Sequence, residues 1–118
     1  MTHDNDGLLA RQFSGYPDAH GDRRNLLIHA LTVPLFLLGN CAVVAAAWTS
    51  VWLAVGGVAL TAAAIGLQGR GHAFESGRPA PFRGPINAVL RILAEQWITF
   101  PRFVLSGGFS RAWRGPRA

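Results

Sequence analysis

Two long uncharged apolar runs, separated only by Thr49 and Ser50, constrain the fold more than any other feature of this chain. They cover residues 30–48 and 51–67. Each is close to the roughly 20 residues that a helix needs to cross the hydrocarbon core of a bilayer. The pattern predicts two antiparallel helices over residues 23–47 and 51–75, paired as a hairpin. The alternative is that both helices are buried in the core of a soluble bundle.

The composition favours a membrane as the solvent of this hairpin. Half of the 118 residues are hydrophobic and 14% are charged, whereas about a quarter of the residues are charged in an ordinary soluble domain. Trp48 and Trp52 flank the turn, where amphipathic rings suit a membrane interface. Small residues three or four apart would let the two backbones approach closely. These are Gly39, Ala42 and Ala46 in the first run and Gly56, Ala59, Ala63 and Gly66 in the second.

The charge distribution indicates a partner and an orientation. All eleven basic residues are arginines, and eight of them lie from Arg70 onward. Arginines beside apolar segments favour contact with anionic lipid headgroups, and we expect no nucleic-acid partner. Because arginines flank the open ends of both runs, the positive-inside rule places both ends in the cytoplasm. We expect a multi-pass protein of the bacterial inner membrane that could form homo-oligomers.

Outside the hairpin, the sequence predicts an arm, a third helix and a tail. Residues 1–15 are expected to be a flexible polar arm that could end in a short helical stretch around residues 8–13. Pro17 and Gly21 are expected to break regular structure before the first long helix. After the proline-rich segment 77–82, a helix is expected to begin at Pro85 and to be kinked or ended by Pro101. Its apolar face recurs at helical spacing. That face consists of Ile86, Val89, Leu90, Leu93, Trp97 and Phe100.

The opposite side of this third helix carries Arg91 and Glu95, which we expect to form an ion pair one turn apart. Residues 110–118 form a basic tail, which leaves residues 16–109 as a single helical membrane domain. The fold class is therefore all-α: a membrane-embedded hairpin and a C-terminal amphipathic helix in a small bundle.

Polar residues gather at the open end of the hairpin. Asn25 and His29 share one helical face, as do His72 and Glu75, and the rise of about 1.5 Å per residue brings the two histidines to a similar depth. His20 can join them only if the break at Gly21 folds it back. Imidazoles near a carboxylate suit Fe(II), Mn(II) or Zn(II). Alternatively, the histidines are polar caps at an interface, and Glu75 orients an imidazole.

Two motifs in this region resemble those of the Mpo1-like family of small membrane proteins. The first reads Tyr16-x3-His20-x4-Asn25-x3-His29, and the second reads Gly71-His72-x2-Glu75-x3-Pro79-Ala80. The resemblance runs from about residue 16 to residue 105.

The resemblance implies an Fe(II)-dependent dioxygenase that converts a 2-hydroxy fatty acid and O2 into the fatty acid one carbon shorter. The implied iron ligands are His20, His29 and His72, with Asn25 and Glu75 as polar partners in catalysis. Two arginines after the hairpin could hold the substrate carboxylate. They are Arg78 and Arg83.

Three other functions stay open at this point. The protein could be a membrane scaffold or lipid-binding protein without chemistry, in which the histidines are polar caps. Two histidines on adjacent helices could be the axial ligands of a haem. A zinc-dependent lipid hydrolase would use Glu75 as its base.

Overall fold

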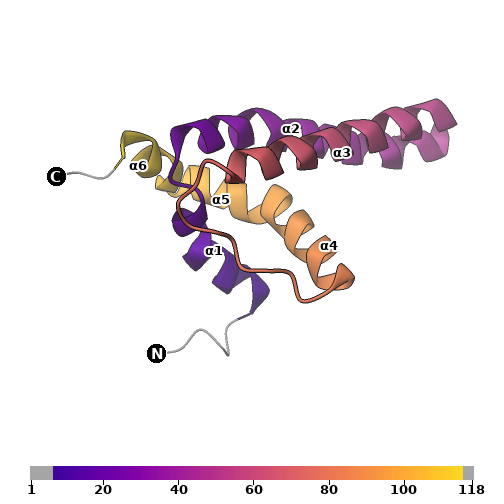
Figure 1. The fold of residues 1–118 in the computed structure, drawn as a ribbon. Coiled ribbons are helices and arrows are strands. Elements are labelled where there is room, and N and C mark those ends of the chain that lie inside the picture. Colours follow the sequence, from indigo (N-terminus) through magenta and orange to yellow (C-terminus); the bar gives the residue numbers. More distant parts are fainter. Residues whose placement is uncertain (1–6, 116–118) are drawn as a thin grey trace. The chain divides into compact units, whose positions relative to one another are not determined.

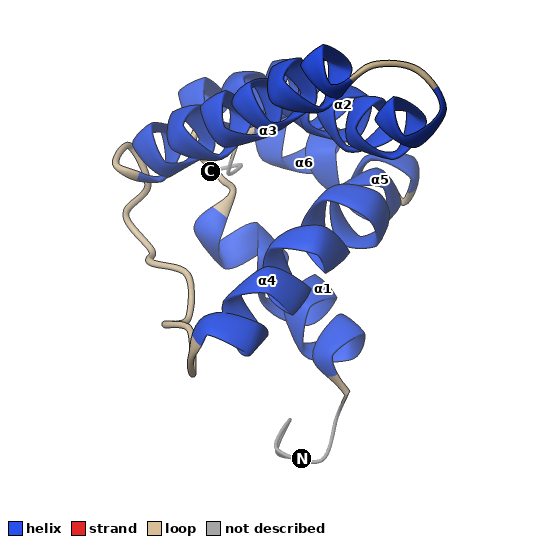
Figure 2. Ribbon diagram, turned by 90° about the vertical axis from the view of Figure 1, so that its right-hand side faces the viewer, coloured by secondary structure: helices blue, strands red, loops and turns tan. Residues whose placement is uncertain are grey.

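The computed structural model describes residues 7–115, and this part of the chain is helical without any strand (Figure 2). The all-helical prediction is confirmed. The elements are α1 (Leu8–Ala19), α2 (Arg23–Ala45), the short 3₁₀ helix η1 (Ala46–Trp48), α3 (Val51–His72), α4 (Pro85–Ala94), the π-helical turn η2 (Glu95–Thr99), α5 (Phe100–Leu105) and α6 (Gly108–Arg114).

The chain divides into two compact units. Residues 24–74 form the first, called here the hairpin unit; the segments before and after it form the second, called the terminal unit. The chain passes between them at Arg23–Arg24 and again at Phe74–Glu75. The expected division into an arm, a domain over 16–109 and a tail stays a prediction. Its residues 1–6 and 116–118 lie outside the described residues.

In the hairpin unit, α2 and α3 run side by side and are joined by η1 and a tight turn (Figure 1). The Ser50 hydroxyl caps α3 by accepting the Trp52 N–H at 3.1 Å, which satisfies one of the free donors at a helix start. The predicted hairpin and its turn are confirmed. The seam between the helices repeats every three or four residues on both sides. Its buried positions include Asn25, His29, Thr32, Phe36 and Gly39 on α2 and Gly57, Ala64, Gln68 and Gly71 on α3.

The backbones come closest where Gly39 faces Gly57. A Cβ atom on Gly39 would lie 2.7 Å from the Gly57 carbonyl oxygen, and one on Gly57 would lie 2.6 Å from the Gly39 carbonyl oxygen. Gly39 was expected at this interface, but the face predicted for α3 was wrong by one position. Gly56 and Gly66 have open space where a Cβ would stand. Because α3 is apolar or small all round, no amphipathic stripe marks which side faces α2.

The outer surface of the hairpin unit is apolar. Both helices are long and apolar enough to cross a membrane, and only 22% and 17% of their most apolar windows are buried. Polar side chains instead pair inside the seam: Asn40 donates to the Thr61 hydroxyl at 3.2 Å, and Gln68 donates to the Thr32 hydroxyl at 3.0 Å. The core helix of a soluble protein would have the opposite distribution.

The terminal unit begins with a helix that is longer than the short stretch predicted around residues 8–13 and that includes the expected break at Pro17. Residues Leu8–Ala19 form α1, with Pro17 in its last turn. A proline there removes one backbone donor without ending the helix, because the helix stops two residues later. Burial of Tyr16 and Ala19 anchors this turn. Part of the expected basic tail is also helical, in α6.

Pro101 widens its helix instead of ending it. Proline cannot donate to the carbonyl four residues earlier, and its ring crowds that carbonyl. The chain accommodates this with η2, in which the Phe100 N–H bonds the Glu95 carbonyl five residues before it. The helix then continues as α5. Phe100 and Phe103 pack their edges against the Tyr16 ring at centroid distances of 6.4 and 4.9 Å, which forms the aromatic core of this unit.

Candidate metal centre

The hairpin unit brings His29 and His72 together. The ring centroids lie 5.1 Å apart with the planes nearly perpendicular. His29 is fully buried, and so is Asn25 one turn before it. Gly71 stands against the Asn25 side-chain amide with no room for a Cβ. The structure therefore places these two histidines at one depth, as the helical rise predicts.

One nitrogen of the His29 ring forms a hydrogen bond within its own helix. Nδ1 lies 3.0 Å from the carbonyl oxygen of Asn25, four residues earlier. A carbonyl accepts and cannot donate, so Nδ1 carries the hydrogen. In the neutral ring this leaves the lone pair on Nε2, which is the arrangement that metal-binding histidines commonly adopt.

Gln68 and Thr32 support the two rings from one helical turn further along the seam. Thr32 follows His29 by three residues, and Gln68 precedes His72 by four. The Gln68 amide donates to the Thr32 hydroxyl, which donates in turn to the Ile28 carbonyl at 2.6 Å. This pair ties α2 to α3 directly beside the histidines.

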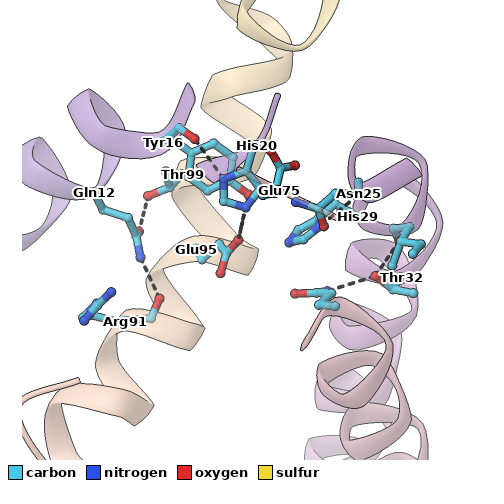
Figure 3. A network of polar contacts seen from close by, with 12 residues as sticks. Gln12, Tyr16, His20, Asn25, His29, Thr32, Glu75, Arg91, Glu95 and Thr99 are labelled. Atoms are coloured by element: carbon cyan, nitrogen blue, oxygen red, sulfur yellow. Dashed lines mark hydrogen bonds and ion pairs between the residues drawn. The ribbon is translucent and has the colours of Figure 1, made fainter. Parts of the chain in front are cut away.

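The terminal unit holds the third histidine, His20, by the same local device. Its Nδ1 lies 2.9 Å from the carbonyl oxygen of Tyr16, again four residues earlier. The imidazole also stacks on the Tyr16 ring, with centroids 3.6 Å apart and planes 5° from parallel. Nε2 then lies 3.3 Å from Oε2 of Glu95 (Figure 3). Although His20 follows Pro17, the continuation of α1 positions it rigidly.

Tyr16 also contacts the carboxylate of Glu95. Its hydroxyl donates to Oε2 at 2.7 Å. Burial of the ring, with the nearby Glu95 charge and this hydrogen bond, raises the pKa of Tyr16 well above its ordinary value. The Tyr16 phenol therefore keeps its proton at neutral pH and donates it in the hydrogen bond to Glu95.

Glu75, the carboxylate predicted for the site, accepts hydrogen bonds from backbone N–H groups. Oε1 accepts the N–H groups of Gly21 and Asp22 at 2.9 and 3.1 Å, and Oε2 accepts that of Asp22 at 3.0 Å. These donors form the turn that leads into α2, so Glu75 caps the turn between His20 and Asn25. Arg78 and Arg83 lie exposed in the loop between α3 and α4. Their predicted role in holding a carboxylate stays a prediction.

The sequence reasoning missed Glu95 as a site residue. Glu95 was assigned to the side of its helix opposite the apolar face, paired with Arg91, yet its side chain is only 17% exposed. The Arg91 guanidinium donates to the carbonyls of Ala80 and Pro81 at 2.8 and 2.9 Å. Two matched four-residue spacings could have revealed the contact. They are Gln12-x3-Tyr16-x3-His20 and Arg91-x3-Glu95-x3-Thr99.

The distances within each unit fit ligation of a divalent ion. With metal–ligand bonds of about 2.0–2.2 Å and angles of about 90–110°, two ligating atoms on one ion lie about 2.8–3.6 Å apart. The 3.3 Å between His20 Nε2 and Glu95 Oε2 falls in that range. Two imidazoles on one ion would have centroids about 4.5–5.2 Å apart by the same geometry, and His29 and His72 match this. The residue types His20, His29, His72 and Glu95 could hold a metal ion.

Comparison with known proteins gives one result. Neither the curated proteins nor the solved structures include a match to this chain. A family model described as "2-hydroxy-palmitic acid dioxygenase Mpo1-like" matches residues 8–105. This match covers all the helices from α1 to α5 and every histidine discussed above. The chain therefore belongs to the Mpo1-like family.

Proposed function

We propose that this protein is a membrane-bound Fe(II)-dependent dioxygenase that shortens 2-hydroxy fatty acids by one carbon. The family description names a dioxygenase of 2-hydroxypalmitic acid. The observation that carries the proposal is the shared arrangement of His20 and His29. Each donates Nδ1–H to a backbone carbonyl one turn earlier and offers Nε2 as a ligand. Imidazoles with a carboxylate suit Fe(II) that keeps open coordination positions.

We propose further that His20, His29 and His72 are the ligands of this iron, the set that the two family motifs imply.

The proposed reaction balances without a further reductant. A 2-hydroxy acid and one O2 contain the atoms of the acid one carbon shorter, CO2 and one water. The bond between C1 and C2 breaks, C2 is oxidised from an alcohol to a carboxyl carbon, and O2 accepts the four electrons. Bound Fe(II) would supply the means of activating O2 and of binding the substrate hydroxyl and carboxylate. The chain's own contribution is to hold three imidazoles and to exclude water from the buried His29 and Asn25.

The hairpin unit supports a membrane location for this chemistry. At about 1.5 Å per residue, 22 and 26 helical residues span about 33 and 39 Å, enough for a hydrocarbon core about 30 Å thick. Trp48 and Trp52 at the turn are 80% and 76% exposed and suit the far interface. The arginine-rich open end would then face the cytoplasm and contact anionic lipids, in a bacterial inner membrane.

The haem alternative fits the hairpin poorly. Two axial imidazoles on opposite sides of one iron would have ring centroids about 6.4 Å apart, given iron–nitrogen bonds near 2.1 Å. The His29 and His72 centroids are closer, at 5.1 Å, and the planes are nearly perpendicular. Ligands on adjacent coordination positions fit this geometry better.

The first test is metal content and oxygen consumption. Protein purified without oxygen is expected to contain nearly one iron per chain and to consume O2 with 2-hydroxypalmitic acid but not with palmitic acid. His20→Ala, His29→Ala and His72→Ala should each lose iron while remaining folded. His3→Ala, which replaces the fourth histidine, is the matched control and should keep it. A wild-type protein that binds no iron after anaerobic loading contradicts the proposal and favours a scaffold or lipid-binding role.

The membrane location is tested with the single cysteine. Cys41 is exposed on α2, so a water-soluble maleimide should fail to label it in membranes and should label it after denaturation in detergent. In a Cys41→Ser background, Ser110→Cys on the exposed surface of α6 is the accessible control. Equal labelling of both positions in intact membranes would contradict the spanning hairpin.

A further inference from the structure

The terminal unit contains two carboxylates near His20, Glu75 and Glu95, and their contacts differ. Glu75 accepts three backbone hydrogen bonds from Gly21 and Asp22. The Glu95 carboxylate instead contacts two side chains, the Tyr16 hydroxyl and the His20 imidazole. A carboxylate that holds a turn is structural, whereas one aimed at a histidine Nε2 is placed for ligation.

Two helix faces hold Glu95 in position (Figure 3). Gln12 donates to the Arg91 carbonyl at 2.9 Å and accepts from the Thr99 hydroxyl. Arg91 and Thr99 lie four residues before and four residues after Glu95, so Gln12 clamps both sides of its turn to α1. Tyr16 and His20 follow Gln12 on the same face of α1 and contact Glu95 directly.

The backbone at Glu95 is also unusual. The π-helical turn η2 begins at this residue. Such wide turns are rare and often occur at functional sites, because they rotate a side chain out of the α-helical register. Here Pro101 provides the local cause, and the low exposure of Glu95 is the result.

The distance between Glu95 and His20 is compatible with shared ligation. Two atoms bound to one ion lie about 2.8–3.6 Å apart, and the 3.3 Å between His20 Nε2 and Glu95 Oε2 falls in that range.

We propose that Glu95 supplies the carboxylate ligand of the metal centre, that Tyr16 is the residue that positions it, and that Glu75 has a structural role. This inference rests on the proposed function. It assigns a carboxylate at a position that the two sequence motifs do not include.

The test measures Co(II) binding to metal-free full-length protein, with Co(II) absorption as a direct report on the ligands. Glu95→Gln, which keeps an acceptor for the Tyr16 hydroxyl, should weaken Co(II) binding at least tenfold and change the visible spectrum. Tyr16→Phe keeps the stacked ring and should weaken binding about tenfold, the effect expected for loss of a supporting hydrogen bond. Glu95→Asp should restore part of the affinity lost in Glu95→Gln.

Two variants provide the comparison. Asp18→Asn removes an exposed carboxylate from α1, two residues before His20, and should leave affinity and spectrum unchanged. Glu75→Gln should bind Co(II) within about threefold of the wild type, because it loses only a cap, and should unfold at a lower temperature. Loss of Co(II) binding in Glu75→Gln with normal binding in Glu95→Gln would overturn the assignment. Failure of the wild type to bind Co(II) or Fe(II) overturns the proposed function as well, so the two failures are distinguishable.

Discussion

The hairpin unit and the terminal unit are held together in different ways. The seam of the hairpin combines close glycine contacts and amide, hydroxyl and histidine side chains with three buried apolar ones, Leu26, Val33 and Phe36, while most of its large apolar side chains face outward. The terminal unit has an aromatic core, in which Phe100 and Phe103 pack against Tyr16. Apolar burial stabilises a unit only when water is the alternative, and helices in lipid associate through close backbone packing and hydrogen bonds. The outward apolar side chains of the hairpin unit are what the proposed membrane location predicts.

The strongest test of this comparison is to remove an aromatic ring from the core of the terminal unit. Phe103 is 1% exposed, so Phe103→Ala should lower the free energy of unfolding by about 3–5 kcal/mol. Leu105→Ala, an apolar truncation at a position 87% exposed, is the control and should change it by less than about 0.5 kcal/mol. Thermal unfolding followed by near-ultraviolet circular dichroism measures both. Equal effects would mean that the aromatic contacts do not form a core.

In the hairpin unit, the free energy of unfolding should change most when side-chain volume is added at the helix contact. In Gly57→Ala the new methyl meets the Gly39 carbonyl and Val43, and we expect a loss of about 1–3 kcal/mol. The matched variant Gly56→Ala enters open space and should be neutral or slightly stabilising, because alanine favours a helix. Unfolding in detergent micelles, measured by far-ultraviolet circular dichroism, compares the two. If Gly56→Ala is the more harmful, α3 faces α2 through the side first expected from the sequence.

Loss of a polar pair in the seam should lower the free energy of unfolding less than disruption of the close backbone contact. Gln68→Leu and Asn40→Leu each remove an interhelical hydrogen bond, which costs about 0.6–1.7 kcal/mol in membrane proteins. Only Gln68 lies beside the histidines, so Gln68→Leu should also weaken metal binding, whereas Asn40→Leu should not. Parallel unfolding and metal titrations test this. Equal metal affinity in both variants would restrict Gln68 to helix pairing.

The smallest effect should come from the titration of Tyr16 in the terminal unit. Its raised pKa means that the folded state holds the phenol proton more tightly than the unfolded state. The resulting stability is fully present below the unfolded pKa of 10.0 and is lost as pH rises above it toward the folded pKa. Tyr16 is the single tyrosine in the chain, so ultraviolet absorbance of phenolate reports on it alone. In chelator-treated folded protein the phenolate should appear at higher pH than in denaturant; coincident curves would contradict burial of this ring.

The sequence predicted the hairpin well because length and apolar composition determine it. The gap between the two apolar runs places the turn at Ser50. The similar depth of His29 and His72 then follows from the helix rise. The face of α3 could not be predicted, because Gly56 and Gly57 have the same character and only the partner helix distinguishes them. The prediction that Glu95 lies opposite the apolar face of its helix was wrong for another reason. Spacing arguments assume 3.6 residues per turn, and Pro101 changes that period just where Glu95 lies.

The continuation of α1 beyond residue 13 shows a third limit. Pro17 was interpreted as a break, yet a proline near the end of a helix costs little when its neighbours Tyr16 and Ala19 are buried. That burial involves residues far along the chain, such as Phe103. Local sequence therefore could not indicate that α1 continues far enough to position His20.

The close approach of Gly39 and Gly57 also limits what the hairpin can conduct. Carbonyl groups of the facing helices already occupy the space that even a methyl group would need. A water molecule requires comparable room and several polar partners. The contact between α2 and α3 therefore contains no aqueous conduit at this level, and neither ions nor polar solutes can permeate along it.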